Sequence, residues 1–229
     1  MHARERRPCE DAWIRGESRR MNVVAVADGM GSRSNARVGA RAACRAARDA
    51  ARLWSPTSSP RLLGLLVELL WRMRIAPLEP NDCASTCLVA LRTGDGAWTA
   101  GGVGDGLAVY RDPQRGHDVV VGDRGTEFGN STTALGVGNS PDRWKWKAFR
   151  ENELGGAVVL ASDGVADDLL PERLGGSVEW LVEDVGSLPA PRRACAIKQS
   201  LRQWPTPNHL DDKTVAAMWS VPARAHGGE

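Results

Sequence analysis

Short apolar runs that end in an acid and a glycine are the clearest pattern along the chain. Residues 23–27 (VVAVA) are valine-rich and uncharged, and Asp28 and a glycine follow directly. Such a run predicts a buried strand that ends in a sharp turn. The design recurs at residues 157–161 (AVVLA), which lead through a serine to Asp163 and a glycine. An acid at such a position either caps the turn or holds a cation or phosphate at the rim of the sheet, and the local sequence alone favours the cap.

Other apolar runs and periodic patterns predict groups of consecutive strands separated by pairs of helices. We expect strands at residues 12–15, 21–27, 85–91, 97–103, 106–112, 118–123, 144–148, 157–161 and 215–219. We expect helices at residues 32–52, 61–75, 177–185 and 190–204, the first with Ser32 or Ser34 as its N-cap. This order is typical of an α+β or layered fold. One domain over residues 1–229 is the simplest organisation, with residues 223–229 as a disordered tail.

The second predicted helix, RLLGLLVELLWRMRI, is strongly apolar. A helical face is predicted by the spacing of Leu62, Leu65, Leu66, Leu69 and Leu70. We expect this face to be buried against a sheet. The alternative is a partner-binding face, and the core role is favoured.

Two glycine-rich segments predict turns. Residues 94–96 (GDG) indicate a hairpin turn. Residues 101–106 (GGVGDG) superficially resemble a dinucleotide-binding loop, but Leu107 stands where the last glycine of GxGxxG belongs and no helical pattern follows. A hairpin turn that carries Asp105 is the better interpretation. The polar residues 122–141 are expected to form a loop near the site.

Composition excludes several classes of protein. A net charge of +2 is too small to indicate a nucleic-acid or anionic-membrane partner. No window approaches 18 uninterrupted apolar residues, and the N-terminal sequence MHARERRPCED lacks the apolar core of a signal peptide. The five cysteines are scattered and form no zinc set. We therefore expect reduced thiols in a cytoplasmic protein.

Acids that lie beside glycines or at strand ends are the candidate functional residues of the chain. They are Asp28, Asp105, Asp163 and Asp211, with Glu10 and Asp11 near the first strand. If they converge, their charges cannot all persist without cations. Carboxylates without His or Cys suit Mg²⁺ or Mn²⁺. Two such ions can activate a shared water toward phosphorus while neutralising the phosphate oxygens.

Six motifs in this order and spacing resemble the metal-dependent protein phosphatases of the 2C family. They are EDAW, VVAVADGMGS, STCLVAL, GGVGDGLAVY, VVLASDGVADDL and DDKTVAAM, and they span residues 8–221. The DGMGSRSNARVGARAA segment, PCED and the DDKT ending look most like a compact bacterial branch. The resemblance implies a four-layer α+β sandwich, in which two antiparallel sheets are flanked by pairs of helices, with metals in a cleft at one edge.

The resemblance also implies roles for individual residues. Asp28 would bridge two Mn²⁺ or Mg²⁺ ions, and the Gly29 carbonyl would bind the second. Asp163 and Asp211 would complete the shell of the first ion. Each remaining acid has one implied role: Glu10 would bind the second ion, Asp11 would orient metal-bound waters, and Asp105 and Asp167 would serve a third, weaker ion with Asp163.

Three departures from the family pattern concern residues around the site. Met30 stands where many members have a histidine proposed as general acid, so the leaving group must take its proton from water or another group. Gly106 and Leu107 replace the usual Ser-Arg after the aspartate. The arginine that binds the substrate phosphate matches Arg6 best by spacing, with Arg7 adjacent.

The function implied by the resemblance is that of a serine/threonine protein phosphatase. A metal-activated hydroxide would attack phosphorus without a covalent enzyme intermediate. The partners would be a phosphorylated protein and a cognate serine/threonine kinase, with no nucleic acid and no membrane, and the protein would be a monomer. The alternative is a catalytically weak or silent module that binds a phosphoprotein or kinase.

Overall fold

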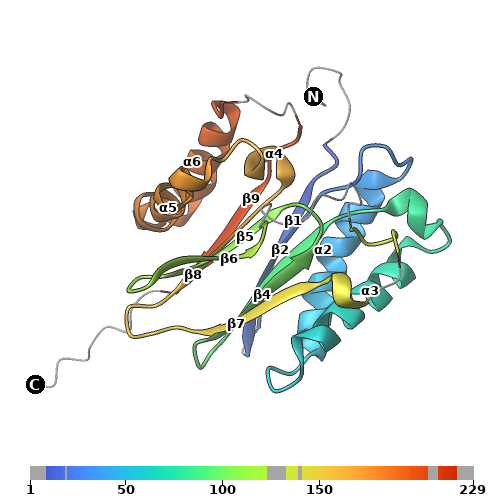
Figure 1. Cartoon of the computed structure of the whole chain (residues 1–229), viewed down its shortest axis with the longest axis horizontal. Coiled ribbons are helices and arrows are strands. Elements are labelled where there is room, and N and C mark those ends of the chain that lie inside the picture. The colour runs from blue at the N-terminus through green and yellow to red at the C-terminus, as the bar shows by residue number, and fades with distance from the viewer. Residues whose placement is uncertain (1–8, 19, 123–132, 139–140, 206–210, 221–229) are drawn as a thin grey trace, which may run out of the picture.

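Two antiparallel sheets lie face to face in the computed structural model, which describes residues 9–18, 20–122, 133–138, 141–205 and 211–220 (Figure 1). The first sheet has the order β1 (Ala12–Glu17), β2 (Met21–Ala27), β3 (Cys87–Thr93), β4 (Ala97–Val103), β7 (Lys145–Arg150). The second has the order β6 (Gly116–Val121), β5 (Leu107–Asp112), β8 (Ala157–Ala161), β9 (Val215–Trp219). All neighbouring strands are antiparallel.

Helices cover the outer face of each sheet (Figure 1). On the first sheet lie α2 (Ala36–Leu53) and α3 (Pro60–Ile75), and on the second α5 (Pro171–Glu179), the π-helical segment η3 (Trp180–Val185) and α6 (Ala190–Arg202). Three short helices complete the described chain: α4 (Asp163–Ala166), η1 (Pro80–Cys83) and η2 (Pro141–Arg143). The predicted four-layer α+β sandwich is confirmed.

Strand β2 is buried on both faces, which explains its uncharged sequence. Val24 and Val26 belong to the core between the sheets. Val23, Ala25 and Ala27 belong to the core under α2. Successive side chains of a strand point to opposite faces, so both sets must be apolar. Asp28 is the first position beyond this run, and it is therefore placed at the edge of the sandwich.

Several predicted boundaries differ from the observed ones. The strands at 21–27, 97–103, 157–161 and 215–219 begin and end where predicted. Helix α2 is capped by Asn35, without a side-chain hydrogen bond, and not by Ser32 or Ser34. Helix α5 begins at Pro171 and not at residue 177, because proline fits the first turn of a helix. The helical turn α4 was not predicted.

The prediction for the buried face of α3 was right for Leu66 and Leu70, which are half-buried against the core, and wrong for the other three leucines. Leu62, Leu65 and Leu69 are 43%, 47% and 56% exposed. The buried row consists of Leu63, Val67, Trp71 and Ile75, together with Gly64, and it belongs to the core shared with α2. Leucines occur on both sides of this helix, so spacing alone could not select a face. The neighbour of α3 is a helix, and Trp71 Nε1 donates to the Gly39 carbonyl at 3.1 Å.

The two glycine turns have different outcomes. The hairpin at residues 94–96 is confirmed, because Gly96 has a φ of +79° and its N–H donates to the Thr93 carbonyl at 3.1 Å. Residues 104–106 do not form a hairpin. They carry the chain from β4 in the first sheet to β5 in the second, so β4 and β5 do not pair with each other.

Most of the predicted loop at 122–141 and the predicted tail at 223–229 lie outside the described residues. Over the described ranges, no helix is both long and apolar enough to cross a membrane.

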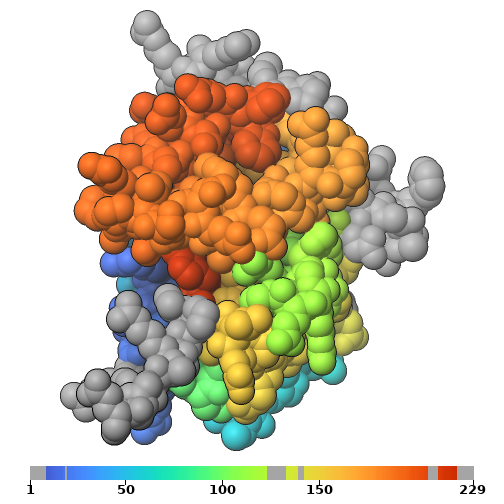
Figure 2. All heavy atoms as spheres, turned by 90° about the vertical axis from the view of Figure 1, so that its left-hand side faces the viewer, coloured from blue at the N-terminus to red at the C-terminus, as the bar shows by residue number. Residues whose placement is uncertain are grey.

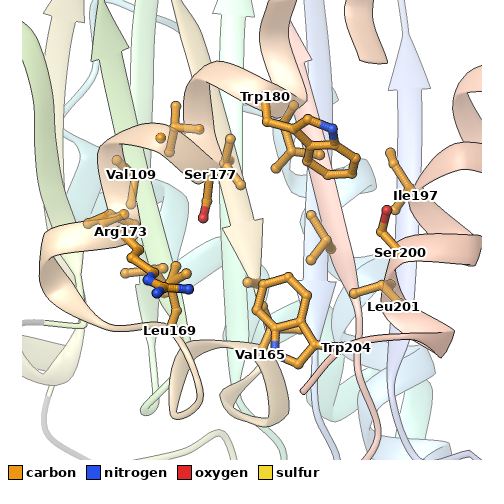
Figure 3. A pocket seen from close by; sticks show the side chains of 18 of the residues that line it. Val109, Val165, Leu169, Arg173, Ser177, Trp180, Ile197, Ser200, Leu201 and Trp204 are labelled. Carbon is orange, nitrogen blue, oxygen red and sulfur yellow. The ribbon is translucent and has the colours of Figure 1, made fainter. Parts of the chain in front are cut away.

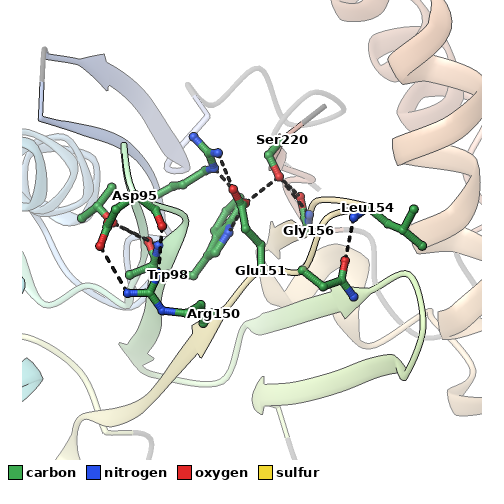
Figure 4. A network of polar contacts seen from close by, with 11 residues as sticks. Asp95, Trp98, Arg150, Glu151, Leu154, Gly156 and Ser220 are labelled. Atoms are coloured by element: carbon green, nitrogen blue, oxygen red, sulfur yellow. Dashed lines mark hydrogen bonds and ion pairs between the residues drawn. The ribbon is translucent and has the colours of Figure 1, made fainter. Parts of the chain in front are cut away.

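A half-buried polar cluster centred on Glu151 holds one end of the sandwich together (Figure 4). Glu151 Oε2 accepts hydrogen bonds from Arg92 Nε at 3.0 Å, Trp98 Nε1 at 2.8 Å and Ser220 Oγ at 2.6 Å. These donors come from β3, from β4 and from the residue after β9. The cluster therefore ties both sheets to the end of β7.

Candidate metal centre

A polar pocket of about 180 Å³ lies at one edge of the sandwich. Its walls come from the segment before β1, the ends of β2 and β8, the β4–β5 connection and the segment before β9. The lining residues are Glu10, Asp28, Gly29, Met30, Gly31, Ser32, Thr86, Asp105, Asp163 and Asp211. The structure thus brings together acids from segments far apart in the chain.

The backbone of Asp28 is held by the residues just before β3. Its N–H donates to Thr86 Oγ1 at 2.9 Å, and the N–H of Thr86 donates to the Asp28 carbonyl at 2.8 Å. Ser85 Oγ donates to the same carbonyl at 2.9 Å. Thr86 and Ser85 were not predicted as site residues, because hydroxyls at the start of a strand carry no distinctive signal. They fix the direction in which Asp28 leaves the sheet.

Gly29 is a glycine because α2 approaches it closely. A Cβ at this position would overlap the backbone carbonyl of Ala36, in the first turn of α2. The residue is buried and forms a bridge with Ser85. The role of its carbonyl as a metal ligand stays a prediction.

Asp11 lies beside Asp28 and is oriented from the second sheet. Ser162 Oγ, at the end of β8, donates to Asp11 Oδ2 at 2.8 Å. The N–H of Thr214 in turn donates to Ser162 Oγ at 3.0 Å. A similar link joins the N–H of Glu10 to Asp212 Oδ2 at 2.8 Å. The first and last strands are thereby tied together at the pocket.

The acids carry more negative charge than the pocket accommodates. Burial, with the charges of Asp11 and Asp163, raises the pKa of Asp28 to about 11. Burial also raises the pKa of Asp11. Burial, with the charges of Asp105 and Asp211, raises the pKa of Asp163. Neighbouring carboxyls that oppose one another's ionisation form a site that lacks positive charge.

The donor set fits hard divalent cations. The Oδ1 atoms of Asp11 and Asp163 are buried and accept no hydrogen bond from any described residue. Oxygen donors of this kind suit Mg²⁺ and Mn²⁺. Across the described ranges, however, no group of three or more His, Cys, Asp or Glu side chains is already arranged to hold a metal ion. The pocket gathers candidate ligands without presetting a coordination shell.

Most, but not all, of the candidate site residues lie at the pocket. Glu10, Asp28, Gly29, Asp105, Asp163 and Asp211 line the pocket, and Asp11 adjoins Asp28. Asp167 is not among the lining residues. Arg6 and Arg7 lie outside the described residues.

Comparisons with known proteins agree with this architecture. A sequence model of the protein phosphatase 2C family matches residues 1–204. No curated protein sequence is significantly similar to the chain. Among solved structures, the serine/threonine phosphatase Stp1 from Staphylococcus aureus is similar with a TM-score of 0.66 and 15% identity, over 94% of this chain and 90% of that one.

Two further structures have the same fold. The serine/threonine phosphatase of S. agalactiae has a TM-score of 0.65 and 15% identity, over 93% of each chain. RsbX, solved in complex with magnesium, has a TM-score of 0.56 and 16% identity, over 93% of this chain and 88% of that one. With its two-sheet sandwich and the family match over residues 1–204, the chain belongs to the protein phosphatase 2C family.

Proposed function

We propose that this protein is a metal-dependent serine/threonine protein phosphatase that hydrolyses phosphate monoesters with two Mn²⁺ or Mg²⁺ ions. The observation that carries the proposal is the convergence of acids from five separate segments on one small pocket, where the pKa of Asp28 is raised to about 11. A structural cap needs one acid, and a cluster of mutually opposing acids costs stability unless it binds cations.

The proposed ligands divide between two ions. Asp28 would hold both, Asp163 and Asp211 would hold the first, and Glu10 and the Gly29 carbonyl would hold the second. Asp105 would serve a third, weaker ion, with Asp167 assisting it. When bound, such ions lower the pKa of a coordinated water and neutralise phosphate oxygens.

The residues around these ligands orient the reactants. Asp11, which accepts a hydrogen bond from Ser162, would orient water at the site, and Arg6 would bind the substrate phosphate. Met30 lines the pocket, and no histidine is among the described lining residues. The leaving alcohol would take its proton from water or from another group. Attack is direct, without a covalent enzyme intermediate, so the phosphoryl group is transferred to water in one step.

The proposed substrate is a phosphorylated protein, the product of a cognate serine/threonine kinase. A bound phosphoserine loses its ester bond to phosphorus and regains its hydroxyl, whereas inorganic phosphate keeps the oxygen of the attacking water. We further propose a monomer with one catalytic domain that works in the cytoplasm.

Hydrolysis of a phosphoserine peptide and of p-nitrophenyl phosphate, with and without Mn²⁺, tests the proposal. We expect turnover that requires Mn²⁺ and that disappears in Asp28→Asn. Asp184→Asn, an exposed aspartate on η3, serves as the matched control and should keep full activity. Activity in Asp28→Asn equal to that of the wild type would overturn the proposal. Calorimetric Mn²⁺ binding without any hydrolysis would support the alternative, a silent phosphoprotein-binding module.

A further inference from the structure

A large apolar cavity lies between part of the second sheet and the helices that cover it (Figure 3). Its volume is about 480 Å³, within the range of small-molecule sites. Val109, Val159 and Val215, from β5, β8 and β9, line its sheet side. Protein interiors are normally packed as densely as organic crystals, with few voids larger than a water molecule. A cavity of this size therefore calls for an occupant.

Helix α6 forms one wall of the cavity and is only loosely packed. None of its residues is buried, although Ile197 and Leu201 face the cavity and are half-buried. Two tryptophans, Trp180 and Trp204, also line the cavity and are half-buried (Figure 3). An apolar occupant would remove these side chains from water, which is favourable in proportion to the area covered.

A few polar groups accompany the apolar lining. Ser177, Ser200 and Arg173 line the cavity, and Figure 3 shows the Arg173 guanidinium beside Leu169. Within the described residues, neither the guanidinium nor the two hydroxyls make a side-chain hydrogen bond or ion pair. Glu172 is the other charged lining residue. A small number of polar groups in an apolar pocket is the usual arrangement for fixing the orientation of a ligand.

We propose that this cavity binds a small amphiphile of the fatty-acid class, with an aliphatic chain and one anionic end. The chain would lie between the valines of the sheet and the apolar side chains of α6. The carboxylate would accept two hydrogen bonds from the Arg173 guanidinium, whose planar fork matches a carboxylate. This site is distinct from the acid-lined pocket, because the two share no lining residue among the described ones.

Calorimetric titration of the full chain with dodecanoate, below its micelle-forming concentration, tests the proposal. We expect one saturable site. Gly176→Phe should weaken binding at least about tenfold by filling the cavity, because a Cβ at Gly176 has no neighbour within 4 Å. Gly176→Ala is the matched control and should bind as the wild type does. If Gly176→Phe does not fold, as judged by circular dichroism, Ser200→Phe fills the cavity from the opposite wall.

The head group provides a second, independent measurement. Dodecanoate should bind more tightly than dodecan-1-ol, and dodecylammonium should bind least. Arg173→Gln should abolish the preference for the carboxylate while leaving the alcohol's affinity unchanged, and Glu172→Gln should strengthen carboxylate binding. The proposal is overturned if no saturable binding occurs, if the cavity-filling variants bind as the wild type does, or if the ammonium binds best. None of these results depends on phosphatase activity.

Discussion

Lys213 and Asp168 form a buried ion pair beside the candidate metal centre. Lys213 Nζ lies 3.2 Å from Asp168 Oδ2, and the two side chains are 9% and 0% exposed. The same ammonium donates to the carbonyl of Gly164, the residue after Asp163. Lys213 itself follows Asp211 by two positions. One ammonium therefore joins the turn that carries Asp163 to the segment that carries Asp211.

We expect Lys213→Met to weaken both stability and metal binding. Breaking a buried ion pair by removing one partner typically costs about 3–5 kcal/mol. Residues that support metal ligands typically change metal affinity by about 10–100-fold when mutated. Denaturant unfolding in EDTA measures the first effect and Mn²⁺ calorimetry the second.

The double variant Lys213→Met, Asp168→Leu separates the two effects. Replacing a whole buried pair by apolar residues is often neutral, so the free energy of unfolding should return to within about 1 kcal/mol of the wild type. The Gly164 carbonyl would still lack its donor, so Mn²⁺ affinity should stay low. Full recovery of affinity would show that Lys213 contributes to stability alone.

The unfolding free energy of the metal-free protein should fall as pH rises. Burial and neighbouring acids raise the pKa of Asp28 to about 11, and the pKa values of Asp11 and Asp163 are also raised. A carboxyl whose pKa is higher in the folded state contributes stability below its unfolded pKa, and that contribution is lost as pH rises toward the folded value. Denaturant unfolding in EDTA between about pH 5 and pH 9 should show the decline.

Saturating Mn²⁺ should remove this decline, because the ion stabilises the ionised carboxylates and binds only the folded state. Asp28→Asn should flatten the pH profile without Mn²⁺ and should lose most of the stabilisation that Mn²⁺ provides. An EDTA profile in which stability rises steadily across this range would contradict the proposed electrostatics. Asp184→Asn should follow the wild type under both conditions.

The acids of the site were predictable, and the groups that hold them were not. Asp28 and Asp163 were identified because each ends an uncharged strand and precedes a glycine. Thr86 and Ser162 act through contacts with residues distant in sequence, at 2.9 Å to the Asp28 N–H and 2.8 Å to Asp11. Lys213 gave no signal of its own, since its partner Asp168 lies 45 positions away in the chain.

In the fold, too, features set by local sequence were predictable, and features set by contacts between distant segments were not. Strand β2 was predicted correctly because burial on both faces removes every charge from its sequence. The buried face of α3 was predicted only in part, because leucines occur on more than one side of this helix and its neighbour is the helix α2. The turn at residues 104–106 was interpreted as a hairpin, since local sequence does not reveal that β4 and β5 pair with different strands.

Glu151→Ala should destabilise the protein without affecting metal binding. The substitution leaves Arg92 and the Trp98 indole without their shared acceptor, at a cost of about 2–4 kcal/mol. The cluster lies near the end of β3 and the start of β4, whereas the pocket lies at the opposite ends of these strands. Denaturant unfolding should therefore change while the Mn²⁺ affinity of the folded protein does not.

Glu151 should also make the protein sensitive to acid. Burial alone would raise the pKa of Glu151. Hydrogen bonds from Arg92, Ser220 and Trp98 outweigh this effect and lower the pKa below its usual value. A carboxyl of this kind contributes stability above its unfolded pKa, and the contribution is lost as pH falls through the folded value. Glu151→Gln should lose less stability than the wild type on acidification below about pH 4.5. An identical loss in both proteins would assign the acid sensitivity elsewhere.

Gly164→Ala should weaken Mn²⁺ binding by moving α4 away from the segment before β9. A Cβ at Gly164 would overlap the backbone carbonyl of Asp212, so the two segments that carry Asp163 and Asp211 could no longer approach. Gly176→Ala is the matched control, because its Cβ has no neighbour within 4 Å and the helix should gain about 0.5–1 kcal/mol. Mn²⁺ calorimetry on the two variants should show weaker binding for Gly164→Ala and unchanged binding for Gly176→Ala. Equal affinities would mean that the separation of Asp163 and Asp211 does not control the metal site.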